Sequence, residues 1–136
     1  MENDSNSALA EFSQAIAGDI LTLPELSDPE WDTYAMVAEV TDFSVKMVAY
    51  RYTESGSPVP TEGPANSWVF VQLRDRTRGT DGEAWDIAIV KIHRDTAQLV
   101  VNFVSGDGAD LWRVNPANIG NLSSMLRPRR EDFLRD

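Results

Sequence analysis

The sequence predicts an α+β protein in which helices pack on an antiparallel sheet of about four strands, in the order α-β-β-α-β-β-α. Two observations support this fold class. Segments with apolar residues at helical spacing alternate with pairs of segments rich in Val, Tyr and Thr, and a short polar turn separates the members of each pair. We expect the helices to cover one face of the sheet. A chain of 136 residues with 42% hydrophobic residues suits a single domain over 1–136, with flexible tails at 1–6 and 129–136.

The first part of the chain predicts a helix and then a β-hairpin. Ser5 or Ser7 is expected to cap a helix over 8–21. Its apolar stripe consists of Leu9, Phe12, Ile16 and Ile20. The alternating pattern of 31–52 then indicates two strands, with Asp42 in the turn between them.

The rest of the chain repeats this pattern of helix and strand pair, and then adds a helix. The expected elements are an extended proline-rich surface loop over 53–64, a helix over 66–79, two strands over 83–93 and 97–104, a loop over 105–110 and a helix over 116–126. The segment 66–79 begins with a strand-like WVFV. Three arginines after it and Asn66 as a possible cap favour a helix. Asn115 is the expected cap of the last helix.

Charge is unevenly distributed along the chain, which has a net charge of -10. Residues 1–45 contain ten acids and no Lys or Arg, whereas residues 46–136 contain twelve acids and twelve basic residues. Such an acidic block repels phosphate, so nucleic acid and anionic membranes are not expected partners and a basic protein is. The alternative is that the acidity only keeps the protein soluble. An acidic N-terminus, no long apolar run and no cysteine predict a cytoplasmic location.

No motif for catalysis or cofactor binding stands out, so we expect neither an enzyme nor a bound cofactor, and a small-molecule substrate is not expected. His93 is the single histidine and has no nucleophile at a recognisable spacing. A glycosidase-like pair of carboxylates stays open without positive support. Two carboxylate groups were considered as metal ligands, namely Asp107 with Asp110, and Asp28 with Glu30 and Asp32. Neither matches the calcium-loop spacing, and no metal site is predicted.

The acidic segment around the predicted hairpin is instead the candidate partner-binding surface. Aromatic residues cluster there, and aromatic and acidic side chains together suit a basic partner. The candidate residues are Glu25, Asp28, Glu30, Asp32, Tyr34, Glu39, Asp42, Tyr52 and Glu54. The alternative is that Trp31, Tyr34, Tyr50, Tyr52 and Trp68 mostly fill the core. The arginines of RDRTR, Arg74 to Arg78, are read as a solvated helix face or as counter-charges to the acidic block.

Several short segments of the chain resemble corresponding segments of the YezG-like immunity proteins of bacterial polymorphic toxin systems. They are the proline after the first helix, Trp31 before the first strand, YRYTESGSPVP, GEAW, FVSGDGADLWRV and the final LRP. The resemblance implies a non-catalytic immunity protein that binds and neutralises a cognate toxin, occluding its active site or a nearby surface. Such toxins are often nucleases, which would make this partner basic. The alternative function is a secretion or assembly chaperone for an exported effector.

Overall fold

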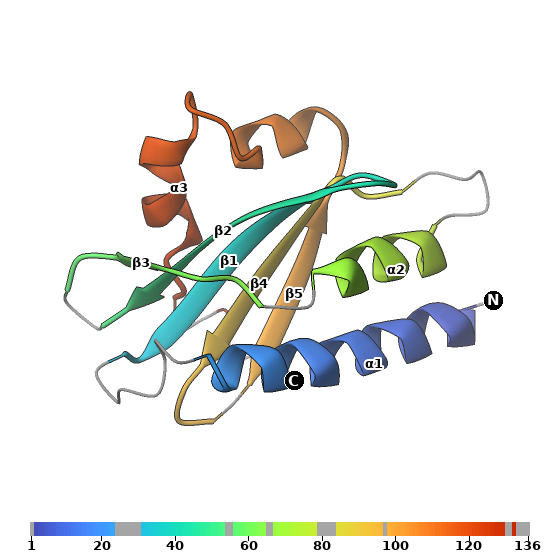
Figure 1. Ribbon diagram of the computed structural model, residues 1–136, viewed down its shortest axis with the longest axis horizontal. Coiled ribbons are helices and arrows are strands. Elements are labelled where there is room, and N and C mark those ends of the chain that lie inside the picture. The colour runs from blue at the N-terminus through green and yellow to red at the C-terminus, as the bar shows by residue number, and fades with distance from the viewer. Residues whose placement is uncertain are drawn as a thin grey trace.

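The protein is an α+β fold with an open antiparallel sheet of five strands between two helical layers (Figure 1). The computed structural model describes residues 2–23, 31–53, 56–64, 67–78, 84–96, 98–129 and 132. The elements are α1 (Glu2–Leu21), β1 (Thr33–Val40), β2 (Val45–Tyr52), β3 (Val59–Thr61), α2 (Trp68–Arg76), β4 (Ile87–His93), β5 (Leu99–Val104), the 3₁₀ helix η2 (Gly106–Trp112) and α3 (Ile119–Leu126). The predicted fold class is confirmed, with one strand more than expected.

The strand order in the sheet is β3-β2-β1-β4-β5. β1 is the central strand and pairs along its length with β2 on one side and β4 on the other. The predicted hairpin is therefore confirmed, as is the second strand pair, β4 with β5. Because neighbouring residues of a strand point to opposite faces, the central strand contributes side chains to both layers.

The first layer contains α1 and α2, which pack on one face of the sheet. The expected apolar stripe of α1 is confirmed, since Phe12, Ile16 and Ile20 are buried against this face. Phe12 meets Phe70 of α2 edge to face, with ring centroids 5.0 Å apart. The predicted cap is wrong, because α1 already begins at Glu2 and therefore contains both Ser5 and Ser7.

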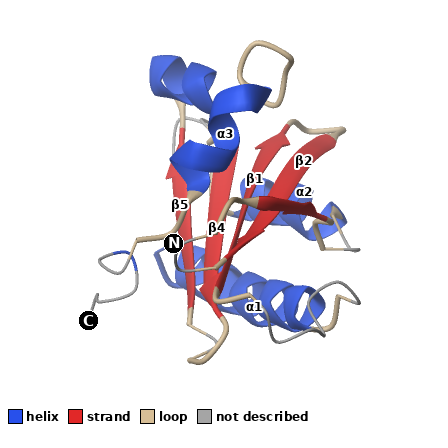
Figure 2. Ribbon diagram, turned by 90° about the vertical axis from the view of Figure 1, so that its left-hand side faces the viewer, coloured by secondary structure: helices blue, strands red, loops and turns tan. Residues whose placement is uncertain are grey.

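The second layer contains η2 and α3, which cover the opposite face (Figure 2). The expectation of helices on one face only is therefore wrong. Leu122 and Leu126 of α3 are buried with Ala35 and Val37 of β1. The physical reason is that β1 is apolar on both of its faces, and a strand with two apolar faces has to be covered twice.

Two segments expected to be loops contain regular structure. β3 lies within the proline-rich segment, and its Pro60 is opposite Tyr50 of β2. An edge strand accepts proline because its outer N–H needs no partner. Gly106–Trp112 forms η2, with Gly106 at a φ of 67°, where the expected loop 105–110 lies. The predicted cap of the last helix is wrong, because α3 begins at Ile119 with Asn118 as its N-cap residue. Asn115 instead closes the preceding turn, where its Oδ1 accepts a hydrogen bond from the Asn118 N–H at 3.0 Å.

Part of the expected C-terminal tail is attached to the sheet. The Lys91 ammonium of β4 donates to the Asp132 carboxylate at 3.0 Å. Partial burial alone would raise the pKa of Asp132, but the Arg129 backbone N–H and the Lys91 ammonium outweigh it and hold this pKa below its usual range. Residues 130–131 and 133–136 of that tail lie outside the described residues.

Candidate partner-binding surface

The structure distributes the predicted partner-binding residues over the length of β1. Asp32 precedes the first residue of this strand, whereas Glu39 and Asp42 lie at its other end. At about 3.3 Å per residue, Asp32 and Asp42 are roughly 30 Å apart along the chain. Four predicted residues, Glu25, Asp28, Glu30 and Glu54, lie outside the described residues. The described members of the set therefore do not form one compact patch.

Tyr34 and Tyr52 are core residues, so their assignment to an exposed binding face is corrected. They are 0% and 1% exposed. The Tyr34 hydroxyl donates to the Glu62 carbonyl at 3.0 Å, and the Tyr52 hydroxyl donates to the Ser123 carbonyl at 2.7 Å. A buried phenol needs such a partner. The alternative reading, that the aromatic cluster mostly fills the core, holds for these two tyrosines and for Trp31 and Tyr50, which are also buried.

Tyr52 is also part of a contact with the C-terminal end of α3. The guanidinium carbon of Arg127 lies 4.8 Å from the centre of the Tyr52 ring. Arg127 donates in addition to the carbonyls of Thr53 and Gly56, at 3.2 and 2.6 Å. Burial raises the pKa of the Tyr52 hydroxyl well above its ordinary value, and the Arg127 charge offsets this only in part. The tyrosine therefore joins α3 to the sheet rather than to a partner.

Asp42 lies in the β1–β2 turn and binds two arginines from α2 and its C-terminal end. Its Oδ1 accepts from the Arg74 Nη1 at 2.7 Å and from the Arg78 Nη2 at 2.5 Å. Arg74 also donates through its Nε to the Trp85 carbonyl at 2.8 Å. The RDRTR arginines are thus counter-charges to the acidic block, one of the two readings of the sequence. The Asp42 side chain is still 57% exposed, and its Oδ2 has no partner among the described residues.

Glu39 is bound on the other face of the sheet, to the segment between η2 and α3. Its carboxylate accepts from the Val114 N–H at 3.0 Å and from the Arg113 Nη1 at 3.2 Å. Hydrogen bonding to Asp110, opposed by partial desolvation and supported by Glu39, raises the pKa of the Arg113 guanidinium further, so it stays charged. Glu39 is consequently a structural anchor of the α3 layer.

Asp86, just before β4, joins these two groups of charges. Its carboxylate lies 3.8 Å from Arg74 and 3.9 Å from Arg113. We refer to Glu39, Asp42, Arg74, Asp86 and Arg113 as the hairpin-end ion-pair network. It runs from one helical layer to the other around the end of the sheet. Two of the acids assigned from sequence to a partner are therefore engaged within the molecule.

The most exposed large apolar side chain at this end is Phe43, which the sequence reasoning did not select. It is 90% exposed in the turn between β1 and β2. The turn is held by Thr41, whose hydroxyl accepts from the backbone N–H groups of Phe43 and Ser44 at 3.2 and 3.0 Å. The Thr41 N–H also donates to the Ser44 carbonyl at 2.9 Å. The available signal was a phenylalanine directly after Asp42, the residue expected in the turn.

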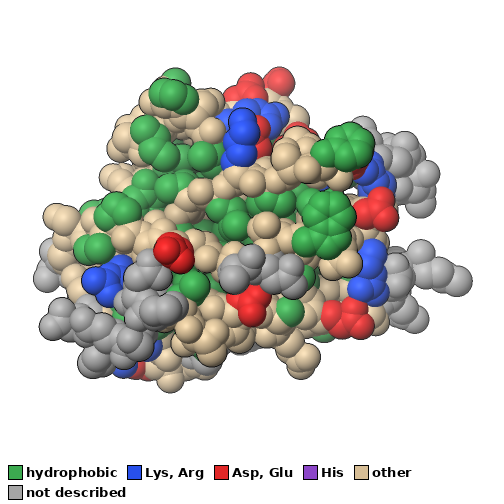
Figure 3. Space-filling view, in the orientation of Figure 1, with side chains coloured by type: hydrophobic (Ala, Val, Ile, Leu, Met, Phe, Trp, Pro, Cys, Tyr) green, Lys and Arg blue, Asp and Glu red, His purple; other side chains and the backbone are tan. Residues whose placement is uncertain are grey.

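Other hydrophobic side chains reach the surface near the sheet. Trp68, at the first turn of α2, is 56% exposed and is the exposed exception within the predicted aromatic cluster. Figure 3 shows hydrophobic side chains in a band over the strands, between the α3 layer and the α1 layer. Charged side chains lie around this band in the same view. An apolar centre with a charged rim is the usual composition of a protein-binding surface.

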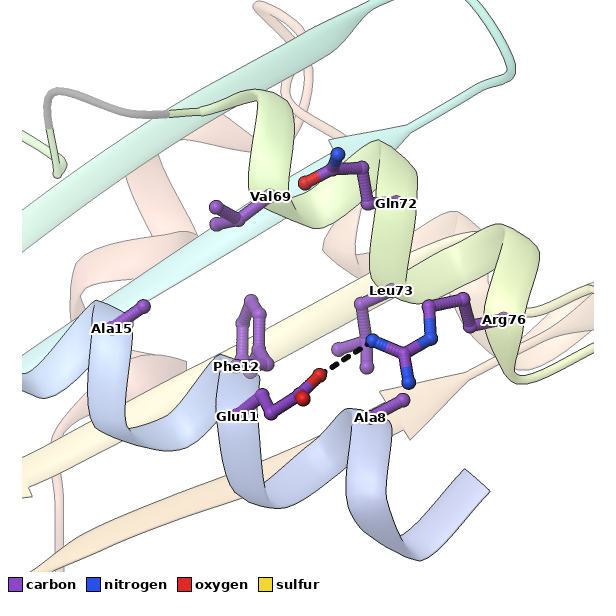
Figure 4. Close-up of a pocket in the computed structure, with 8 residues that line it drawn as sticks. All are labelled: Ala8, Glu11, Phe12, Ala15, Val69, Gln72, Leu73 and Arg76. Carbon is purple, nitrogen blue, oxygen red and sulfur yellow. Dashed lines mark hydrogen bonds and ion pairs between the residues drawn. The ribbon is translucent and has the colours of Figure 1, made fainter. Parts of the chain in front are cut away.

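A small crevice lies between α1 and α2 (Figure 4). Its volume is about 180 Å³, below the roughly 300–1,000 Å³ typical of ligand pockets. It is lined by Ala8, Glu11, Phe12, Ala15, Val69, Gln72, Leu73 and Arg76. Glu11 and Arg76 form an ion pair across it at 2.6 Å. The two charged side chains of the crevice therefore neutralise each other, and its volume is too small for a typical ligand.

Of the residues considered for metal binding or catalysis, Asp28 and Glu30 lie outside the described part of the chain, and the others form no metal cluster in it. There, no group of three or more His, Asp or Glu side chains is placed to hold a metal ion. Asp110 pairs with Arg113 at 3.2 Å, and the His93 Nδ1 accepts from the Asp95 N–H at 3.3 Å.

Within the same ranges, no helix has both the length and the apolar character needed to cross a bilayer.

No protein-family model matches the chain, and no curated protein matches it. A function therefore has to be inferred from the fold and from the chemistry of the exposed side chains.

Proposed function

We propose that the protein is a non-catalytic immunity protein that binds a basic toxin domain, with the turn between β1 and β2 as the contact that docks it. The exposed Phe43 is the observation that carries this proposal. Exposing a phenyl ring to water is unfavourable, and burying it in a partner recovers about 1.5–3 kcal/mol. The Thr41 hydrogen bonds hold the turn in one conformation, so little entropy is lost when it binds.

Electrostatics support a basic partner. Within the described residues, most basic side chains are already paired with carboxylates. These are Arg74, Arg76, Arg78, Lys91, Arg94 and Arg113. The chain has 22 acids against 12 basic residues, which gives the net charge of -10. A field of that sign accelerates association with a cationic protein and repels nucleic acid.

The chemistry next to Phe43 fits the same partner. Both arginines on Asp42 use Oδ1, which leaves Oδ2 facing solvent for a lysine or arginine of a bound protein. Trp68 supplies a second exposed aromatic at the first turn of α2, and the arginines that bind Asp42 lie in and just after the last turn of this helix. The proposed contact set is therefore Phe43, Asp42 and Trp68, in place of the tyrosines and Glu39 selected from the sequence.

The experiment is co-expression in bacteria with the basic C-terminal domain of a toxin-like protein encoded by the adjacent gene. We expect that domain to stop growth alone and to be neutralised, and bound, by the wild-type chain. Phe43→Ala should weaken binding at least tenfold, which corresponds to about 1.4 kcal/mol. Val59→Ala is the matched control, because Val59 is 43% exposed on β3, away from the turn.

Three results would contradict the proposal. They are an adjacent gene that encodes no such domain, a domain that stays toxic when the chain is present, and equal affinity of Phe43→Ala and wild type. If the bound domain is unfolded by circular dichroism and hydrogen exchange, the chaperone function replaces inhibition. Among the described residues, the α1–α2 crevice has a volume of only about 180 Å³, less than an extended segment of a client protein fills, so the exposed Phe43 makes inhibition the first choice.

A further inference from the structure

β5 is an edge strand whose outer side has no neighbour in the described part of the chain. It lies at the end of the strand order and pairs only with β4. Its six residues, Leu99–Val104, are all partly exposed. Figure 2 shows β5 at the margin of the sheet. A strand in this position presents a row of backbone donors and acceptors to its surroundings.

The hydrogen-bond pattern identifies which backbone groups point outward. The His93 N–H donates to the Gln98 carbonyl at 3.0 Å, so residue 98 faces β4. In an antiparallel ladder the direction alternates from one residue to the next. Leu99, Val101 and Phe103 therefore direct their N–H and C=O groups away from β4. No backbone partner exists for these three residues within the described ranges.

The opposite edge of the sheet is protected in ways that β5 is not. β3 has only three residues, and its centre is Pro60. The chain after β3 then passes over β2, where Gly63 lies so close that an added Cβ would be 3.0 Å from the Met47 sulfur. β5 has no proline, no glycine and no charged residue from 98 to 105. Such devices normally prevent strand pairing between molecules, and β5 lacks them.

We propose that β5 pairs with β5 of a second copy of this chain, antiparallel and about a two-fold axis at Val101. Val101 then faces its symmetry mate, and Leu99 faces Phe103 of the other copy. One donor from each of three residues in each of two copies gives about six new backbone hydrogen bonds. The two sheets join into one continuous sheet, and the exposed edge disappears.

The side chains of β5 fit this arrangement. Leu99, Val101 and Phe103 share the α1/α2 face, where they pack on the core, so the cross-strand contacts on this face are apolar. On the opposite face, Val100 lies opposite Asn102 of the other copy. Phe103 is already fixed by stacking on Trp85, with ring centroids 4.6 Å apart. A two-fold interface needs a surface that complements itself. The apolar row of Leu99, Val101 and Phe103 offers such a surface on the α1/α2 face.

The charge of the chain permits a second copy to bind at this strand. Two molecules of net charge -10 repel each other, so a contact between copies is favoured where no charged side chains come together. Residues 98–105 contain no charged side chain, so pairing along β5 brings none against its counterpart. The pairing leaves the β1–β2 turn and Phe43 at another part of the molecule, so it is independent of the proposed toxin contact.

The experiment measures the mass of the full chain by light scattering and sedimentation over a wide concentration range. We expect twice the 15.1 kDa of one chain. Val101→Lys should weaken dimerisation at least tenfold, because it places two ammonium groups opposite each other at the axis. Val59→Lys makes the same change on the β3 edge and should leave the mass unchanged. Circular dichroism establishes that both variants fold.

A measurement on the wild type covers the case in which Val101→Lys does not fold. The Val101 N–H should exchange with deuterium slowly at high protein concentration and at least tenfold faster on dilution. A monomer at all concentrations would overturn the proposal, as would a folded Val101→Lys that dimerises like wild type. Loss of the dimer in Val59→Lys but not in Val101→Lys would place the interface on the other edge. Concentration-independent exchange at Val101 would exclude the β5 pairing as well.

Discussion

The two faces of the sheet are covered in different ways. On the α1/α2 face, 18 of the described residues form a buried hydrophobic cluster. On the α3 face, the corresponding cluster has nine. Since buried apolar area supplies most of the stabilisation, α1 and α2 are held mainly by packing. The α3 layer has about half as many such residues and needs additional attachment.

Polar contacts provide that attachment. Tyr52 donates to the carbonyl of Ser123 in α3, Arg127 binds two loop carbonyls, and Glu39 holds the backbone of Val114. Each contact joins residues more than 70 positions apart in the sequence. Because a few specific hydrogen bonds attach the α3 layer, the loss of a single one of these side chains should lower its stability strongly. Substitutions on the two faces test this difference.

The largest effect is expected from Phe12→Ala on the α1/α2 face. Phe12 is buried against Phe70, and truncation of a buried phenylalanine costs about 3–5 kcal/mol. Urea denaturation followed by circular dichroism measures the loss. Phe43→Ala is the matched control and should change stability by less than about 0.5 kcal/mol, because Phe43 is exposed. Equal losses for the two variants would show that the α1/α2 core is not what stabilises the fold.

Glu39→Ala should have the next largest effect, on the α3 layer. It removes the acceptor for the Val114 N–H and the ion pair with Arg113. Hydrogen bonds to a charged group contribute about 1.5–3 kcal/mol. Hydrogen exchange should show faster opening of α3 with little change in α1. Asp95→Ala, which affects only a pair with the neighbouring Arg94, is the control. Uniform loosening of both layers would contradict the separate attachment of α3.

Tyr52→Phe removes a single hydroxyl and should lower the free energy of unfolding by about 1–2 kcal/mol, since the Ser123 carbonyl loses its donor.

The Tyr52 hydroxyl also predicts that the stability of the fold depends on pH. Its pKa is raised in the folded state, so its contribution is complete below the unfolded pKa of about 10 and is lost as the pH rises above that value. Thermal unfolding from pH 8 to 11 should show a decline at the alkaline end. The decline should be smaller in Tyr52→Phe, and an identical one would assign it to other groups.

Local features of the fold were predictable from the sequence, whereas the layer arrangement was not. The hairpin and α2 follow from alternation, from turn residues and from the arginines after an apolar start. The two-sided covering had a signal in the runs YAMVA and IAIV, in which both strand faces are apolar. The order of helices along the chain does not indicate which face of the sheet each helix covers.

The candidate site was less predictable, because the role of an acid depends on what the fold brings next to it. Asp42 meets Arg74 across 32 positions, and Glu39 meets Arg113 across 74. A count of charges along the chain assigns such acids to a partner, although the fold uses them internally. Exposure has the same limit, since Tyr34 and Phe43 are both aromatic residues near the hairpin but have opposite environments. Which of them faces solvent depends on the packing.

The smallest effect on stability is expected for Asp42→Ala, although Asp42 belongs to the proposed contact set. Its carboxylate is more than half exposed, and exposed ion pairs contribute about 0–1 kcal/mol because water and salt screen them. If Asp42 only served the fold, the variant would bind the toxin domain like wild type. We expect instead a several-fold slower association at low salt, measured by stopped-flow fluorescence, with the difference shrinking at high salt. Glu11→Ala removes a comparable exposed pair with Arg76 on α1 and should leave the association rate nearly unchanged. A difference between these two variants would distinguish an acid that meets the partner from an acid that only balances an arginine.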